Sequence, residues 1–165
     1  MVIVCLQLNL GVRRQPRIGD MTLEEIARVE AELDVRLPRD YRALMLAYPF
    51  PPESFTAEFV MPNDASRLIE INRERSTQEV APYNGGGKGP SSSYFEIGGD
   101  GGEERYLIDL AQQQSPVYLY DIETGELREA ASDLQSFVKQ CAASDDMIRR
   151  DEGITTRTAW WQFWR

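Results

Sequence analysis

The hydrophobic positions are most regular over residues 22–34, where they predict an amphipathic helix. Ile26, Val29 and Leu33 recur at the spacing of one helix face. Thr22 and Glu25 form the pattern of a capping box, in which each side chain accepts a hydrogen bond from the other residue's backbone N–H. We therefore expect a helix that begins at a defined residue and buries one face against the rest of the chain.

A second helix is predicted over residues 38–48. Pro38 suits the first turn of a helix, because the N–H that proline lacks has no partner there, and Pro49 ends the helix. The apolar side chains again follow helical spacing, at Tyr41, Leu44, Met45 and Tyr48. The two tyrosines could form a recognition surface or belong to the core. We favour the core, because the apolar stripe accounts for both rings.

The remaining pattern predicts five strands and a mostly antiparallel sheet. Apolar and aromatic runs between glycine, proline and polar residues indicate strands over 55–61, 94–97, 106–110, 117–121 and 126–128. The glycine-rich turn at 98–102 joins two of these runs as a β-hairpin with an enlarged loop. Because a strand and not a helix follows these glycines, they do not form a dinucleotide-binding fingerprint.

Two further helices are predicted over residues 64–76 and 132–143. Asn63 or Asp64 caps the first, and Ser132 opens the second as part of another capping box. The buried face of the second helix is expected to consist of Leu134, Phe137, Val138 and Cys141. Helices that pack on a mostly antiparallel sheet define an α+β fold, and the chain is expected to form a single domain of this class.

The sequence predicts that the chain is divided into three regions. Residues 1–20 are expected to hold a strand near 2–10 and a basic linker, residues 21–143 the main domain, and residues 144–165 a tryptophan-rich tail. The aromatic side chains of the tail could fold back on the domain, beside the N-terminal strand, or form an interface with another chain. We favour folding back, because exposed apolar patches of this size are uncommon. Residues 84–93 form a glycine- and serine-rich loop without the Lys-Ser or Lys-Thr pair of a phosphate loop.

The composition is that of a soluble globular protein with an acidic surface. The 165 residues suit one domain with a substantial core, and the formal net charge is −9. Such a surface repels phosphate backbones, so nucleic-acid binding is not expected, whereas a basic protein would be attracted. Charge alone favours a simpler interpretation, in which acidity keeps the protein soluble. No apolar run is long enough to span a membrane and no secretory signal is present, so we expect a cytoplasmic protein.

Few residues offer catalytic or metal-binding chemistry. The chain has no histidine, which removes the commonest general base and metal ligand. Cys5 and Cys141 stand far apart, and we expect two reduced, buried thiols in place of a disulfide. The adjacent acidic pairs, such as Glu103-Glu104, are interpreted as solvated side chains. We therefore expect a protein without a metal or other cofactor that is not an enzyme.

Several motifs resemble the SMI1/KNR4 family of the SUKH superfamily. A glutamate-rich first helix precedes a Leu-Pro-x-Asp-Tyr element at residues 37–41, and residues 68–72 give a Leu-x-x-x-Asn pattern. An Ile-Gly turn at 97–98 leads into a glycine-rich acidic loop and a strand that ends in Asp109-Leu110. A Pro-Val-Tyr strand and a helix carrying Phe137 complete a resemblance that spans about residues 22–141. The chain departs from the family pattern after Tyr48, where prolines replace the usual Asn-Gly turn.

The resemblance implies two alternative functions. Many bacterial members of the superfamily are immunity proteins, which bind and neutralise a toxin of a polymorphic toxin system by stoichiometric blockade. The expected partner is then a basic toxin domain, bound through Asp100, Glu103, Glu104, Tyr118, Tyr120, Asp121, Glu123, Trp160, Trp161 and Trp164. Ordinary solvent-exposed turns are an equally good interpretation of the acidic positions. The alternative function is that of a non-catalytic regulatory scaffold, and the choice between monomer and homodimer is open.

Overall fold

The structure is a computed structural model that describes residues 20–77 and 90–151. Its first helix, α1 (Leu23–Leu33), confirms the capping box at its start. The Glu25 N–H donates to the Thr22 hydroxyl oxygen at 3.1 Å, and the Thr22 N–H donates to the Glu25 carboxylate at 2.7 Å. The predicted N-terminal strand and most of the loop at 84–93 lie outside the described residues.

The second helix is shorter than the sequence pattern predicts. α2 (Arg39–Met45) is followed by non-helical backbone up to Tyr48. The segment before α1 binds the backbone at this point: the Met21 N–H donates to the Met45 carbonyl at 3.0 Å, and the Asp20 carboxylate accepts from the Tyr48 N–H at 3.0 Å. These bonds give the backbone partners other than a continued helix. The apolar stripe is nevertheless buried through Tyr48, which confirms its place in the core.

The segment predicted as a strand over 55–61 is a short π-helix, so that prediction was wrong. In η1 (Thr56–Val60) the exposed rings Phe55 and Phe59 lie four residues apart, as on one face of a helix, and do not alternate with buried residues as in a strand. The Asp145 carboxylate accepts from the Thr56 N–H at 3.2 Å and thereby satisfies a donor at the helix start. Because Asp145 comes much later in the chain, the local pattern gave no sign of this contact.

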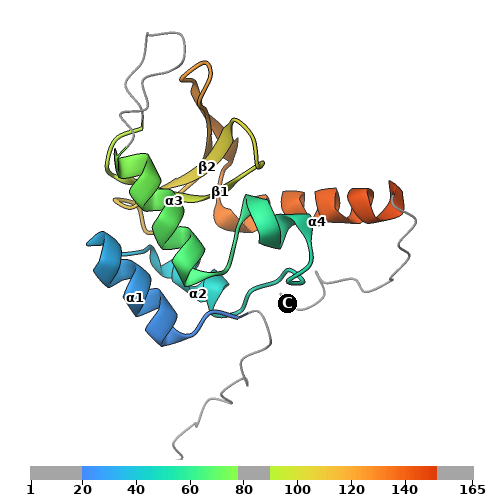
Figure 1. Ribbon diagram of the computed structural model, residues 1–165. Coiled ribbons are helices and arrows are strands. Elements are labelled where there is room, and N and C mark those ends of the chain that lie inside the picture. The colour runs from blue at the N-terminus through green and yellow to red at the C-terminus, as the bar shows by residue number, and fades with distance from the viewer. Residues whose placement is uncertain (1–19, 78–89, 152–165) are drawn as a thin grey trace, which may run out of the picture.

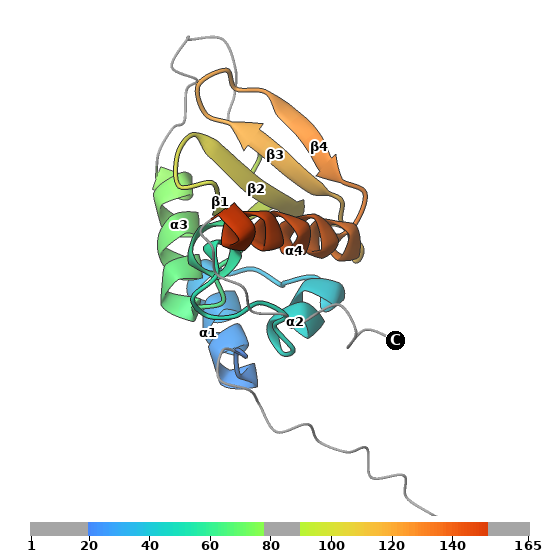
Figure 2. The same ribbon diagram turned by 90° about the vertical axis from the view of Figure 1, so that its right-hand side faces the viewer.

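The four remaining predicted strands are confirmed and form one antiparallel sheet. They are β1 (Tyr94–Gly99), β2 (Glu104–Asp109), β3 (Val117–Asp121) and β4 (Leu127–Ala131). Neighbouring strands in the sequence are also neighbours in the sheet, in the order β1-β2-β3-β4. Figure 1 shows the helices gathered around this sheet, and Figure 2 shows its four strands side by side. The α+β fold expected from the sequence is therefore present.

The last helix, α4 (Leu134–Asp151), extends beyond the predicted end at residue 143. Its cap is Asp133 and not Ser132, because the Asp133 carboxylate accepts from the Ser136 N–H at 2.7 Å. α4 crosses the sheet at the end where α2 lies (Figure 2). Cys141 on this helix is a free, buried cysteine, as expected, and its burial raises the pKa of the thiol to about 12.

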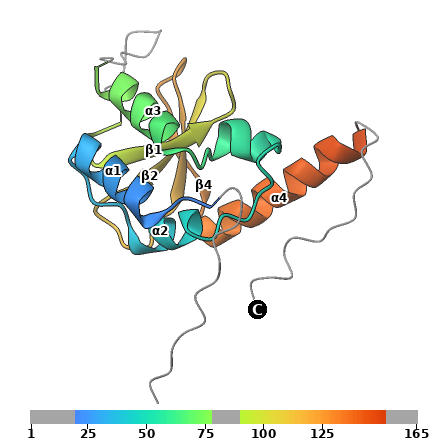
Figure 3. The same cartoon turned by 60° about the horizontal axis from the view of Figure 1, so that its bottom comes forward.

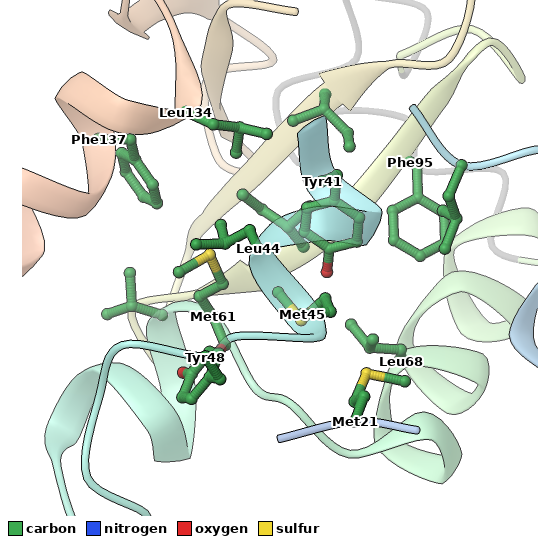
Figure 4. Packing of buried hydrophobic residues seen from close by; sticks show 14 of the residues in the cluster. Met21, Tyr41, Leu44, Met45, Tyr48, Met61, Leu68, Phe95, Leu134 and Phe137 are labelled. Atoms are coloured by element: carbon green, nitrogen blue, oxygen red, sulfur yellow. The ribbon is translucent and has the colours of Figure 1, made fainter. Parts of the chain in front are cut away.

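The core lies between the sheet and the helices. The Tyr41 ring of α2 meets Phe95 of β1 edge-on, with ring centroids 5.8 Å apart. Figure 4 shows this pair in the same core as side chains from two other helices, Leu68 of α3 (Ala65–Thr77) and Leu134 of α4. The Tyr48 hydroxyl donates to the Met61 carbonyl and so joins the segments on either side of η1.

Helix α3 covers the outer edge of β1 through a side chain that replaces a neighbouring strand. The Asn72 amide donates to the Glu96 carbonyl at 2.8 Å, and its oxygen accepts from the Glu96 N–H at 2.8 Å. Asn72 is 5% exposed. Figure 3 shows α3 running beside β1, and α1 also packs on α3. The edge of β1 is thereby satisfied at Glu96 and shielded by α3.

The side chain of Glu96 is itself buried at this edge. Its carboxylate lies 3.4 Å from the Arg105 guanidinium, and only 7% of the side chain is exposed. Burial raises the pKa of Glu96 to about 7, although Arg105, Arg75 and Arg67 oppose this by favouring the charged form. Glu96 therefore titrates near neutral pH in the folded protein.

We expect Asn72→Ala to destabilise the fold by about 2–4 kcal/mol, because two buried backbone groups of β1 lose their partners. Urea unfolding should show a lower midpoint with an unchanged slope. Glu70→Ala on the exposed face of α3 removes only a surface ion pair with Arg67 and should cost less than about 1 kcal/mol. Equal effects of the two substitutions would contradict a specific role for the Asn72 amide.

We expect the free energy of unfolding to contain a contribution from Glu96 that is lost as pH rises. The folded pKa of about 7 lies above the ordinary glutamate value, so protonation favours the folded state and the contribution disappears between about pH 5 and 8. Glu96→Gln should remove this decline, which is on the order of 2 kcal/mol. Urea titrations from pH 5 to 8 measure it. Glu58→Gln, at an exposed carboxylate nearby, is the control and should retain the decline.

Candidate partner-binding surface

Two hairpin turns bring the predicted acidic residues together at one end of the sheet. The β1–β2 turn carries Asp100 and Glu103, and the β3–β4 turn carries Glu123. Glu104 and Asp121 are partners in the register of β2 and β3. The Ile122 N–H also donates to the Glu103 carbonyl at 3.0 Å, which joins the two turns directly. Both turns lie at the end of the sheet opposite α1 and α2 (Figure 2).

The β1–β2 turn is fixed by its own side chain and by glycine. One oxygen of the Asp100 carboxylate accepts from the Gly102 N–H at 2.7 Å and from the Glu104 N–H at 3.1 Å. Gly101 has a φ of 82°, in the left-handed region that favours glycine. These contacts hold the turn in one shape while leaving the Glu103 side chain exposed.

The β3–β4 turn is also fixed by an aspartate carboxylate that accepts backbone hydrogen bonds. The Asp121 carboxylate accepts from the Glu123 N–H at 2.9 Å and from the Thr124 N–H at 3.0 Å. The hydrogen bond from the Thr124 N–H is the main cause that lowers the pKa of Asp121, and the bond from the Glu123 N–H lowers it further. Gly125 completes the turn with a φ of 71°. Asp121 therefore stays charged and organises the backbone, whereas the side chain of Glu123 is exposed beside it.

The carboxylates are close enough to influence one another. Partial desolvation raises the pKa of Glu103, and the neighbouring carboxylates of Glu123, Asp121 and Asp100 raise it further. Two arginines temper the negative charge: Arg128 lies 3.5 Å from the Glu104 carboxylate, and Arg105 donates to the Gly102 carbonyl at 2.6 Å. The surface of the two turns remains predominantly acidic, and we call Asp100, Glu103, Glu104, Asp121 and Glu123 the acidic end.

The two predicted tyrosines are less available than the acids. Tyr120 is only 3% exposed, so its ring is not presented to a partner. Tyr118 is half-buried and meets the Tyr94 ring edge-on, with centroids 5.4 Å apart. Their position on β3 leaves only Tyr118 with accessible surface to offer. The three tryptophans predicted to bind a partner lie outside the described residues.

Helix η1 packs against the β1–β2 hairpin that carries part of the acidic end. This contact was not predicted from the sequence. A side chain at Gly98 would collide with the backbone carbonyls of Phe59 and Val60. A Cβ at Gly101 would approach the Phe59 ring to 3.3 Å. The glycines of the turn therefore permit close approach to η1 as well as a tight turn. The sequence pattern predicts a strand over 55–61 and gives no sign that this segment packs against the hairpin.

The described part of the chain offers little else for chemistry. Over residues 20–77 and 90–151 no group of three or more His, Cys, Asp and Glu side chains is arranged to hold a metal ion. No helix in the same residues combines the length and the apolar character needed to cross a membrane. The arrangement at the acidic end is suited to electrostatic binding, because Asp100, Glu103 and Glu123 are exposed and the backbone of both turns is held in place.

Comparison with known proteins identifies the family of this fold. The SMI1 / KNR4 family (SUKH-1) matches residues 20–140, which is most of the chain and includes α1, the sheet and the first part of α4. A comparison with curated proteins found no match. The matched region contains the whole acidic end, Asn72 and the glycines that pack on η1. The chain belongs to the SMI1/KNR4 family (SUKH-1).

Proposed function

We propose that the protein is a bacterial immunity protein that binds and neutralises a cognate toxin by stoichiometric blockade. Membership of the SUKH-1 family supports a binding protein of the immunity or regulatory type. The observation that carries the proposal is the acidic end, where two hairpin turns present exposed carboxylates on a fixed backbone. The toxin is then a protein domain with a basic surface, met in the cytoplasm of the producing cell.

The proposed blockade works by charge and shape and needs no catalytic step. A toxin that acts on a nucleic acid needs a basic surface to hold its phosphates. The acidic end would cover that surface and deny the substrate access, and the net charge of −9 would speed the encounter. Because Asp100 and Asp121 are already bonded to the backbone of their turns, little conformational entropy is lost when the partner binds.

Hydrogen bonding to the turn backbone separates the acids that build the surface from those that are free to act on the partner. Glu103 and Glu123 are exposed and lie near one another, whereas the Asp100 and Asp121 carboxylates accept hydrogen bonds from the backbone of their turns. We assign these two residues the direct contacts with basic side chains. Asp100 and Asp121 position the turns instead, so their replacement would disturb binding through the backbone.

Capture of partners from the native cell lysate tests the proposal. We expect the tagged wild-type protein to retain one basic protein with a toxin-like domain, and we expect high salt to weaken this capture, because exposed charges are screened. Glu103→Gln combined with Glu123→Gln should reduce capture at low salt by about tenfold or more, as expected when close charge pairs are lost. The captured protein is then tested for growth inhibition in cells that do or do not express wild-type protein.

A matched control removes the same charge elsewhere. Glu24→Gln combined with Asp34→Asn changes two exposed acids on and after α1, away from the turns (Figure 1). This variant should capture the partner and protect cells as the wild type does. Equal loss in both double variants would assign the effect to net charge alone. Capture of several signalling proteins, none of them toxic, would favour the regulatory alternative and overturn the immunity proposal.

A further inference from the structure

A groove of about 460 Å³ lies between α2, the segment after it and α4, remote from the acidic end. Its walls are largely apolar: Leu44 and Phe50 form one side, and Leu134, Val138 and Ala142 of α4 form the other. Figure 2 shows α2 and α4 close together at the end of the sheet opposite the two turns. The groove has the size of a site for a few large side chains.

A buried carboxylate that lines the groove has one oxygen without a hydrogen-bond partner among the described residues. Asp145 is 6% exposed, and only one of its oxygens is used, by the Thr56 N–H. The other oxygen, Oδ2, is buried without a partner in the described part of the chain. An unsatisfied buried acceptor is costly, so a donor that enters the groove would be favoured. The groove therefore suits an occupant that is apolar and also carries hydrogen-bond donors.

The charged residues of the groove favour a positively charged occupant. Acidic side chains outnumber basic ones among its lining residues, with Asp40, Asp133, Asp145 and Asp146 against Lys139 and Arg149. Asp133 and Asp40 already accept backbone hydrogen bonds, whereas Asp146 is exposed at the rim. An aromatic segment with basic residues at its ends would match both the walls and the rim.

The last nine residues of the chain have this composition. The segment 157–165, Arg-Thr-Ala-Trp-Trp-Gln-Phe-Trp-Arg, begins and ends with arginine and contains no acid. Its tryptophans bring large apolar area and an indole N–H that donates but cannot accept. The apolar area of the tryptophans matches the walls of the groove, and the indole N–H can donate to Asp145 Oδ2.

The segment is tethered where it can reach the groove. The structure describes α4 to Asp151, and Ala142 in the groove wall lies about 14 Å back along the helix. Trp160 follows Asp151 by enough residues to span up to about 30 Å when extended. A chain that turns back after α4 can therefore lay its aromatic residues along the wall formed by the same helix.

We propose that residues 157–165 bind in this groove of their own chain. The tryptophans cover the apolar walls, one of their donors or an arginine meets Asp145, and Arg157 and Arg165 lie toward the acidic rim. In this arrangement the tryptophans make a contact within their own chain and do not bind the toxin. It is independent of the proposed immunity function, because it uses neither the acidic end nor a toxin.

Tryptophan fluorescence reports on this segment alone. All three tryptophans of the chain, Trp160, Trp161 and Trp164, lie within it. We expect the full-length protein to emit at shorter wavelength than the same protein in denaturant, and acrylamide to quench it several-fold less efficiently. Both properties should persist on dilution, because the contact is within one chain. Emission and quenching equal to those of the denatured chain would overturn the proposal.

Substitution of the groove wall tests where the segment binds. Ala142→Arg puts a long, positively charged side chain into the groove and should shift the emission to longer wavelength and increase quenching several-fold. Ala143→Arg is the control, because the neighbouring residue is exposed and does not line the groove. Circular dichroism establishes that both variants are folded. If Ala142→Arg fails to fold, Asp146→Arg at the exposed rim replaces it, with a smaller shift in the same direction.

Two other outcomes would also overturn the proposal. Emission that moves to longer wavelength on dilution would place the tryptophans on a second copy of the protein. Emission that is equally short in wild type, Ala142→Arg and Ala143→Arg would place them against a different surface.

Discussion

The fold depends on one amide group that closes the edge of the sheet. Asn72 presents both an acceptor and a donor to the Glu96 peptide, as a neighbouring strand would, with both bonds at 2.8 Å. The same amide donates to the Leu68 carbonyl one turn earlier in α3, at 2.9 Å. A helix is thus joined to a strand edge at a fixed register, and the two backbone groups of Glu96 at that edge are satisfied.

Several other features follow from this junction. With α3 fixed on β1, α1 packs on α3, and Arg73 of α3 pairs with Glu32 of α1 at 2.8 Å. The Glu96 side chain is placed in a small buried space and is held there by Arg105. Further along β1, η1 closes on Gly98. The hairpin that carries half of the acidic end is therefore held by α3 at one point and by η1 at another.

Local signals explain how much of this fold could be predicted from the sequence. The box of Thr22 and Glu25 and the cap at Asp64 act within one turn of helix, so their residue types predict helix starts directly. Glycine at positive φ marks the hairpin turns for a similar reason, because few other residues adopt that backbone. The meander order then brings alternate turns to the same end of the sheet, although their direct link through Ile122 was not visible in the pattern.

The misjudged elements are those governed by distant residues. A short apolar run such as 55–61 fits a strand or a helix, and the choice here involves Asp145, which binds the start of η1 from α4. The same holds for Asn72: the sequence shows a Leu-x-x-x-Asn pattern, but the strand that it binds begins more than twenty residues later. Tyr120 is predicted at the partner-binding surface, but its ring is only 3% exposed, and the residues that cover it cannot be read from the pattern along β3.

Asp145 links the architecture to the distribution of charge. It joins η1 to α4 through one oxygen and lines the apolar groove, and its other oxygen is buried without a partner in the part of the chain that the structure describes. An acid in that position is unfavourable for an empty groove and favourable for one that receives a donor. The protein thus has two acidic regions of different character: an exposed one at the hairpin turns, where charge acts at a distance and is screened by salt, and a buried one, where a single hydrogen bond decides what is accepted. The first suits a diffusing basic partner, and the second suits a segment that is already tethered beside it.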